Sequence, residues 1–251
     1  MRRIFKQAVY GAFFLTILSI FLIFLFVGFY RRATCFDGIQ NQKEEGVDCG
    51  GPCISCQLKG LKIAVENIRF FPVGDYRINS IARIRNPSVN YVARLDYEIR
   101  ITNRFGLRAG AAQGITFILP TEIKYLLAPA ISVAYRDISD VRLIIHKIDW
   151  QTQENERFPE IAIENIKTTV DERHIETTGE VHHRSAGVVR RLLVAALFFN
   201  DGGNLIHFST TRLDNIAPFS SRTFEIILPR QHLGEKNIDP RLTEVVAEII
   251  L

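Results

Sequence analysis

Cysteine is absent from most of the chain. All four cysteines of the 251 residues lie between Cys35 and Cys56, so the body that follows has no thiol that could act as a nucleophile. The sequence also lacks the G-x-S-x-G, G-x-x-x-x-G-K-[ST] and His-Glu-x-x-His motifs. Of the six histidines only His182 and His183 are adjacent; a strand would point them to opposite faces, and we expect both to be exposed. The sequence therefore predicts a protein that is not an enzyme.

Charge of one sign is scarce outside the N-terminus. The net charge is +4, but residues 1–30 contain Arg2, Arg3 and Lys6 and no acid, and the rest of the chain has 28 basic and 27 acidic residues. A nearly neutral body lacks the electrostatic footprint of a nucleic-acid-binding protein. We therefore expect no nucleic-acid partner.

Residues 8–30 contain no charged side chain. At about 1.5 Å per residue this segment is roughly 35 Å long, enough to cross a bilayer core of about 30 Å. Tyr10 and Tyr30 lie near its ends, where interfacial aromatic residues are expected. The segment therefore predicts a single transmembrane helix. A cleaved signal peptide and a lipidated Cys35 are the alternatives; signal sequences have shorter apolar regions, and residues 32–34 poorly match a lipidation site.

The basic residues beside this segment predict its orientation. Arg2, Arg3 and Lys6 precede the span, whereas Arg31 and Arg32 follow it. The positive-inside rule then favours a cytoplasmic tail, residues 1–7, and an extracytoplasmic body in the cell membrane.

Residues 31–58 form a cysteine-rich segment next to the span. Cys35, Cys49, Cys53 and Cys56 lie among glycines and a proline and cannot build an apolar core, so the segment needs a covalent or metal staple. Two disulfides in any of three connectivities, or one zinc ion bound by four cysteines, would serve. The spacing does not match two C-x2-C knuckles, which favours disulfides.

Oxygen ligands lie between these cysteines. Asp37, Asn41, Glu44 and Asp48 supply three carboxylates and an amide within twelve residues, a donor set that suits Ca²⁺. The EF-hand pattern is absent, and the same residues also form ordinary turns. Calcium binding and turn formation are both open interpretations.

The string from Cys35 to Cys56 resembles a motif of bacterial secreted and surface proteins, C-x-D-G-x-x-N-x-x-E-x-G-V-D-C-G-G-x-C-x-x-C, with each defined position filled. The resemblance implies an extracytoplasmic location and a disulfide framework. It implies no particular activity.

The rest of the chain alternates apolar and polar residues between turns, which is typical of antiparallel β-structure. Residues 59–150 and 161–251 have a similar order of strands and turns, in which Asn103 matches Asn200, and the polar residues 151–160 are the predicted linker. Two units of about seven short strands predict two β-sandwiches, with a single large sandwich as the alternative.

The turn from Phe199 to Ile206 resembles that of F-x-L-Y-D β-sandwiches, although Ala196 stands where that family often has a bulky residue. Asn86-Pro87-Ser88 and Leu119-Pro120 resemble type-2 late-embryogenesis-abundant domains. The resemblance, to bacterial single-pass membrane proteins with tandem sandwiches, implies seven-stranded immunoglobulin-like sandwiches with a binding or structural role.

The expected fold is mainly β, with one N-terminal transmembrane helix, a small cysteine-rich segment and two immunoglobulin-like antiparallel sandwiches. The expected function is a membrane-anchored extracytoplasmic scaffold that binds an unknown protein partner in the cell envelope. The alternatives are an envelope protein that handles lipid or a small apolar ligand, and a zinc-binding membrane protein facing the cytoplasm.

Overall fold

The computed structural model describes residues 2–29, 35–41, 43–152, 158–234 and 236–250. The chain forms two compact units, Met1–Leu61 and Lys62–Leu251. Each unit is described by itself.

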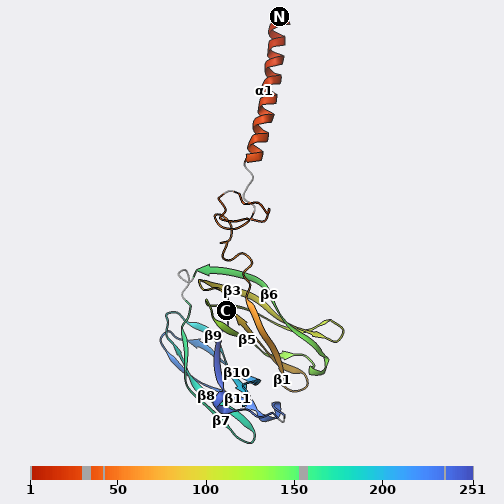
Figure 1. The fold of residues 1–251 in the computed structure, drawn as a ribbon. Helices are drawn as coiled ribbons and strands as arrows, with labels where there is room; N and C mark the ends of the chain where they lie inside the picture. The colour runs from red at the N-terminus through yellow and green to blue at the C-terminus, as the bar shows by residue number, and fades with distance from the viewer. Residues whose placement is uncertain (1, 30–34, 42, 153–157, 235, 251) are drawn as a thin grey trace. The chain divides into compact units, whose positions relative to one another are not determined.

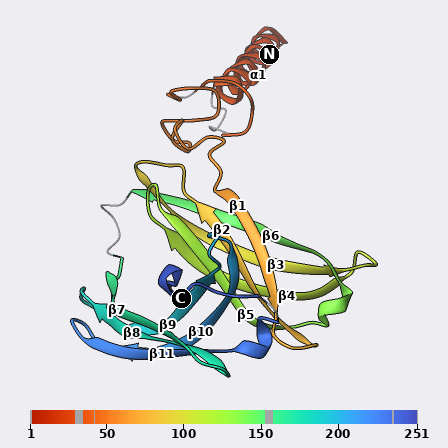
Figure 2. The ribbon, with the colours of Figure 1, turned by 60° about the horizontal axis from the view of Figure 1, so that its bottom comes forward.

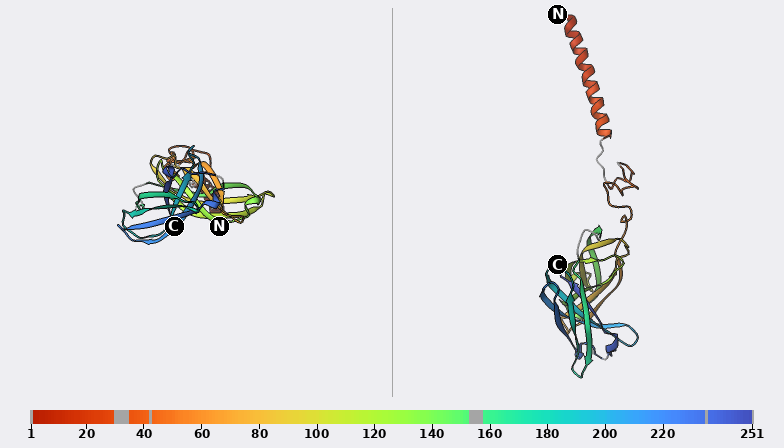
Figure 3. Two further views of the ribbon diagram at one scale, coloured as in Figure 1. Left: turned by 90° about the horizontal axis from the view of Figure 1, so that it is seen from below. Right: turned by 90° about the vertical axis from the view of Figure 1, so that its left-hand side faces the viewer.

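The first unit begins with α1, Arg2–Phe29, which runs without a break (Figures 1 and 3). From Phe5 to Phe26 it is apolar, with mean hydropathy 2.5 and no part buried, so it is long and apolar enough to cross a membrane. The hydroxyl of Thr16 donates to the carbonyl of Ala12 within the helix, 2.8 Å away, which satisfies it without water. Of the predicted span and its flanks, Tyr30, Arg31 and Arg32 lie outside the described residues.

Twelve strands make up the regular structure described in the second unit. The first six are β1 Ala64–Pro72, β2 Arg77–Arg85, β3 Tyr91–Asn103, β4 Arg108–Ile118, β5 Ile123–Ser132 and β6 Ile138–Thr152. The last six are β7 Ile161–Val170, β8 His174–His183, β9 Val189–Phe199, β10 Leu205–Ile216, β11 Ser221–Pro229 and β12 Glu244–Ile249. Short 3-10 turns lie at η1 Tyr135–Asp137, η3 Arg230–His232 and η4 Pro240–Leu242.

The strands form four antiparallel sheets of three strands, ordered β1-β2-β5, β4-β3-β6, β11-β8-β7 and β10-β9-β12. The first two sheets form sandwich 1 and the last two form sandwich 2. The strand order is the same in both sandwiches, so β1 to β6 correspond to β7 to β12 one by one. In Figure 2 the strands of sandwich 1 lie above those of sandwich 2.

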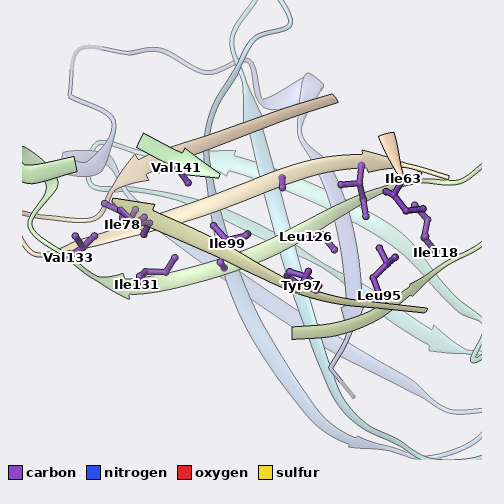
Figure 4. Packing of buried hydrophobic residues seen from close by; sticks show 14 of the residues in the cluster. Ile63, Ile78, Leu95, Tyr97, Ile99, Ile118, Leu126, Ile131, Val133 and Val141 are labelled. Carbon is purple, nitrogen blue, oxygen red and sulfur yellow. The ribbon is translucent and has the colours of Figure 1, made fainter. Parts of the chain in front are cut away.

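The core of sandwich 1 follows from the alternation along its strands. Leu95, Ile99 and Ile101 of β3 are fully buried, because every second residue of this strand faces the sheet β1-β2-β5. Figure 4 shows Ile63 and Ile118 near one end of this core and Ile78 and Val133 near the other. Sandwich 2 has its own core, built around β8, β9 and β11.

A third apolar cluster packs the two sandwiches against each other. Ile81 of β2 and Leu127 of β5 meet Leu193, Ala195 and Leu197 of β9. The alternate residues of β9 belong to the core of sandwich 2, so this strand is buried on both faces. That position explains why its sequence is a continuous apolar run rather than an alternating one. We call this contact the junction.

The turns after β3 and β9 confirm the correspondence between the halves. The Asn103 N–H donates to the Leu107 carbonyl at 2.9 Å, and the Asn103 Oδ1 accepts the Leu107 N–H at 3.0 Å. The Asn200 N–H donates to the Asn204 carbonyl at 3.0 Å, and the Asn200 Oδ1 accepts the Asn204 N–H at 2.9 Å. Gly106 and Gly203 supply the positive φ values of 75° and 71° at matching positions.

The residues after β2 and at the end of β8 have corresponding roles. Asn86 is fully buried and its Nδ2 donates to three carbonyls, at Tyr91, Ile118 and Leu119. The corresponding residue of sandwich 2 is His183, whose Nδ1 lies 3.0 Å from the carbonyl oxygen of Ala217. Our prediction that His183 is exposed is wrong: only 2% of it is exposed, because it ties this loop to the strand end.

The mainly β fold, the apolar helix and the stapled cysteine segment are confirmed. Each sandwich has six described strands rather than about seven. Of the predicted linker, Gln151 and Thr152 belong to β6, where they pair with Val92 and Tyr91, and residues 153–157 lie outside the described residues.

Candidate functional site

The cysteine segment is closed by two disulfides, Cys35–Cys53 and Cys49–Cys56, whose Cα atoms lie 5.5 and 4.8 Å apart. The paired glycines of the motif are required by space: a Cβ at Gly51, where φ is +57°, would lie 2.4 Å from the Lys43 carbonyl oxygen. All four cysteines are in disulfides, so no thiolate remains for zinc, and the zinc-bound alternative is wrong.

The carboxylates of this segment bind backbone N–H groups. Asp48 Oδ1 accepts the N–H groups of Asp37 and Gly38 at 2.9 and 3.0 Å, and its other oxygen lies 3.7 Å from the Lys59 ammonium. Asp37 in turn accepts the Ile39 N–H at 3.0 Å. These contacts fix the turns of the loop.

Glu44 is the buried acid of the segment, with 7% of the residue exposed. Its Oε2 accepts the N–H groups of Asn41 and Asp48, both at 3.2 Å, and its Oε1 lies 3.1 Å from Sγ of Cys53. That sulfur has no hydrogen to donate, because it is bonded to Cys35. The carboxylate therefore organises the loop around it through backbone contacts.

The four predicted calcium ligands thus lie within one loop, where turn contacts use oxygens of Asp37, Glu44 and Asp48. The Asn41 Nδ2 donates to Asp37 Oδ2 at 3.0 Å, and the Asn41 Oδ1 is buried without a hydrogen-bond partner. Calcium binding by Asp37, Asn41, Glu44 and Asp48 stays a prediction.

In the second unit, polar side chains cross the junction between the sandwiches. Asn79 of β2 donates to the Phe208 carbonyl at 3.1 Å, and Arg69 of β1 donates to the Leu205 carbonyl at 3.1 Å. From the other side, Glu248 of β12 accepts the Leu127 N–H at 3.1 Å. These bonds fix the register of an otherwise apolar contact.

Glu248 is the most unusual acid of the junction. It is 5% exposed, and burial raises its pKa to about 7. The Tyr97 hydroxyl lies 3.4 Å from Oε1 and can donate to it; burial, together with this carboxylate, raises the pKa of Tyr97 strongly. Burial also lowers the pKa of the nearby Lys124, whose ammonium donates to the Phe117 carbonyl. Sequence reasoning missed this cluster, although an acid between the apolar residues Ala247 and Ile249 of β12 is a signal for it.

A second buried acid, Glu98, lies on the outer face of β3 and is 2% exposed. Arg100 donates to its Oε1 at 2.7 Å, and Gln113 donates to its Oε2 at 3.2 Å. The Arg100 hydrogen bond is the main reason that the pKa of Glu98 falls to about 2. Arg108 and His146 each lie 3.5 Å away, so this carboxylate is the centre of a surface ion-pair network.

Two histidines meet near the junction, which the sequence did not predict. The rings of His207 and His232 stack with centroids 6.2 Å apart. His207 is buried, its Nδ1 lies 2.8 Å from the Phe208 carbonyl, and burial lowers its pKa. Its Nδ1 and Nε2 lie against the carbonyl oxygens of Phe208 and Pro72, so the polar contacts of this ring are with backbone groups.

A groove of about 180 Å³ lies at the edge of the junction, where the β9–β10 turn meets the sheet of sandwich 1. It is lined by Asn67, Arg69, Ile81, Arg83, Tyr125, Phe199, Gly203, Asn204 and Leu205. Arg69 and Arg83 are already bound, to the Leu205 carbonyl and to Glu66. The groove therefore lies between the two sandwiches, and both arginines that line it already have partners.

No family model and no curated protein sequence matches this chain. Among solved structures, the chain is similar to the crystal structure of red sea bream transglutaminase at 9% identity and a TM-score of 0.24. The match covers 77% of this chain and 32% of the transglutaminase, so this chain spans about a third of that protein's length. A similarity this low carries no argument about activity.

Proposed function

We propose that this protein is a membrane-anchored extracytoplasmic scaffold that presents two β-sandwiches as one body within a cell-envelope assembly. The junction is the observation that carries the proposal. It joins the sandwiches through the Leu193–Leu197 region of β9 and through the buried Glu248 contact. A packed junction holds the outer sheets at a fixed spacing, which is what a scaffold needs.

The disulfides and the apolar helix support the location. Disulfides persist in oxidising compartments, and α1 has the length and composition of a membrane span. In intact cells, an impermeant maleimide should label Cys35 and its neighbours only after an impermeant reductant is added. Labelling that needs permeabilised cells would contradict the orientation, and labelling without reductant would contradict the disulfides.

We propose a non-catalytic role. The buried titratable groups of the second unit bind backbone groups or arginines: Glu98 binds Arg100, Glu248 binds the Leu127 N–H, and His207 lies against carbonyl oxygens. None of these three lines the junction groove. These contacts give the three residues a structural role.

The alternative, an envelope protein that handles lipid or a small apolar ligand, would place the ligand between the sheets of a sandwich. The corresponding space is filled by the largest buried side chains, among them Phe198 in sandwich 2 and Leu95 in sandwich 1. A ligand there would have to displace them.

Photo-crosslinking in the native membrane tests the scaffold proposal. A photo-reactive residue replaces Asp96 on the outer face of β3 or Glu225 on the outer face of β11, and replaces the buried Ala195 as the control. The expected result is one envelope protein captured reproducibly from one outer face and not from Ala195. Capture from neither face would contradict a scaffold role.

A further inference from the structure

The hairpin tip between β3 and β4, Asn103–Arg108, carries two exposed apolar side chains: Phe105 is 74% exposed and Leu107 is 64% exposed. Figure 2 shows this hairpin projecting from the end of sandwich 1. The corresponding turn of sandwich 2 has the same hydrogen bonds but carries Asp201, Gly202 and Asn204. The turn of sandwich 2 lines the junction groove and faces sandwich 1. Where this turn faces protein within the chain, it therefore carries small polar residues in place of Phe105 and Leu107.

The backbone N–H groups of the hairpin tip already have hydrogen-bond acceptors. Asn103 Oδ1 accepts the N–H groups of Phe105 and Leu107, both at 3.0 Å, and the Gly106 N–H donates to the Asn103 carbonyl at 2.9 Å. Backbone groups with internal partners can leave bulk water without losing hydrogen bonds. The turn is therefore suited to a partly apolar environment.

Guanidinium groups surround the hairpin tip. Arg104 lies over the Phe105 ring, 5.3 Å from its centroid. Beside it is a groove of about 520 Å³ whose charged lining residues are Arg100, Arg104, Arg142 and Asp140, together with the hydroxyls of Thr102 and Ser139. Each arginine has a carboxylate partner, yet a guanidinium has five N–H donors, so donors remain for phosphate oxygens.

Two exposed tyrosines extend the same end of sandwich 1. The Arg104 N–H donates to the Asp137 carbonyl at 3.2 Å, which joins the hairpin to η1 and the exposed Tyr135. The Tyr135 N–H donates to the Asp75 carbonyl at 3.1 Å, next to the exposed Tyr76. Exposed aromatic and aliphatic side chains beside arginines are the composition of protein surfaces that enter the bilayer interface.

We propose that this end of sandwich 1 docks on an anionic phospholipid surface. Phe105 and Leu107 enter the boundary between headgroups and acyl chains, and Arg100, Arg104 and Arg142 bind lipid phosphates from the groove. A bilayer rather than a protein is favoured because the apolar tip projects from sandwich 1 and its N–H groups are already paired. The proposal goes beyond the scaffold function and does not need the apolar helix, because the residues that carry it all lie in the second unit.

Vesicle cosedimentation of residues 62–251 tests the proposal, since this unit is compact and has its own apolar cores. The vesicles are phosphatidylcholine alone, or phosphatidylcholine mixed with phosphatidylglycerol. The test variant is Phe105→Ser with Leu107→Ser. The matched control is Phe219→Ser, which removes a phenylalanine that is 73% exposed on the turn after β10.

We expect the parent to bind the phosphatidylglycerol vesicles at least tenfold better than phosphatidylcholine alone, and salt to weaken this binding. The double variant should lose at least tenfold in partitioning, whereas Phe219→Ser should bind like the parent. Absence of binding to anionic vesicles, equal binding by the double variant, or equal loss in the Phe219→Ser control would overturn the proposal. Circular dichroism shows whether each variant folds. If the Phe105→Ser, Leu107→Ser variant does not fold, the variant Arg104→Gln with Arg142→Gln is tested in its place. Undiminished vesicle binding by that arginine variant would also overturn the proposal.

Discussion

The buried carboxylate of Glu248 should make the stability of the second unit depend on pH. Its pKa is about 7 in the folded protein, against 4.5 for an ordinary glutamate. Between these values the folded state holds a proton that the unfolded state has lost, so the free energy of unfolding falls as pH rises. The full effect is present below the ordinary pKa and is lost as pH passes through about 7.

The magnitude follows from the shift. At about 1.4 kcal/mol per pKa unit, the change from 4.5 to about 7 corresponds to about 3 kcal/mol. The variant Glu248→Gln keeps an oxygen for the Leu127 N–H but carries no charge at any pH. We therefore expect it to lie within about 1 kcal/mol of the parent at about pH 5 and to exceed it by about 3 kcal/mol at about pH 8.

Urea unfolding of residues 62–251 across this pH range measures the effect. The matched control is Glu244→Gln, an exposed acid on the same strand and the same face as Glu248, and it should leave the pH dependence unchanged. Lys124 and Tyr97 remain in both variants, and the Glu248 carboxylate raises the pKa of each, so the difference between Glu248→Gln and the parent includes their response to its loss. If Glu248→Gln and the parent run parallel from about pH 5 to about pH 8, the reasoning is wrong.

Three further predictions concern local structure. Asn103→Ala and Asn200→Ala should each destabilise the second unit by about 0.5–1.5 kcal/mol in urea unfolding, since each removes a side-chain oxygen that accepts a turn N–H, and water can bind the exposed N–H in its place; a large difference between them would contradict the equivalence of the turns. Gly114→Ala should cost about 1–3 kcal/mol in the same assay, because the added methyl group would lie 2.7 Å from a buried tyrosine oxygen, and an unchanged midpoint would show that the tyrosine moves freely. If the loop binds calcium, Ca²⁺ should protect the full-length protein from proteolysis between its disulfides, and Asp37→Ala with Asp48→Ala should abolish that protection; no effect of Ca²⁺ on the parent rejects the site.

The sequence was sufficient where a local pattern determines the structure. Asn103 and Gly106 carry the turn chemistry within four residues, and the alternation of β3 marks one buried face, so both could be predicted. The glycine pair and cysteines of the motif likewise implied a stapled loop. In each case the residues that decide the structure lie close together in the chain.

The junction could not be predicted because its partners are far apart in the chain. The apolar run of β9 predicts a strand that is buried on both faces. No nearby residue indicates that its second face packs against Ile81. Glu248 lies 121 residues from Leu127, so its hydrogen bond has no local signal. His183 was misjudged for the same reason, since the carbonyl that buries it belongs to a turn 34 residues later.

The way the sandwiches pack also limits how many can follow one another. The junction joins the sheet β1-β2-β5 of one repeat to the sheet β10-β9-β12 of the next, so the contact is head-to-tail. In a stack of such repeats, one kind of joining surface would stay free at one end and the other kind at the other end. At the free end of sandwich 1, the outward residues of β3 are Asp96, Glu98 and Arg100, where β9 has Leu193, Ala195 and Leu197. A repeat or a second molecule that packed on this face of sandwich 1 would have to bury these charges, so charge at three positions of one strand opposes growth of this geometry at that end.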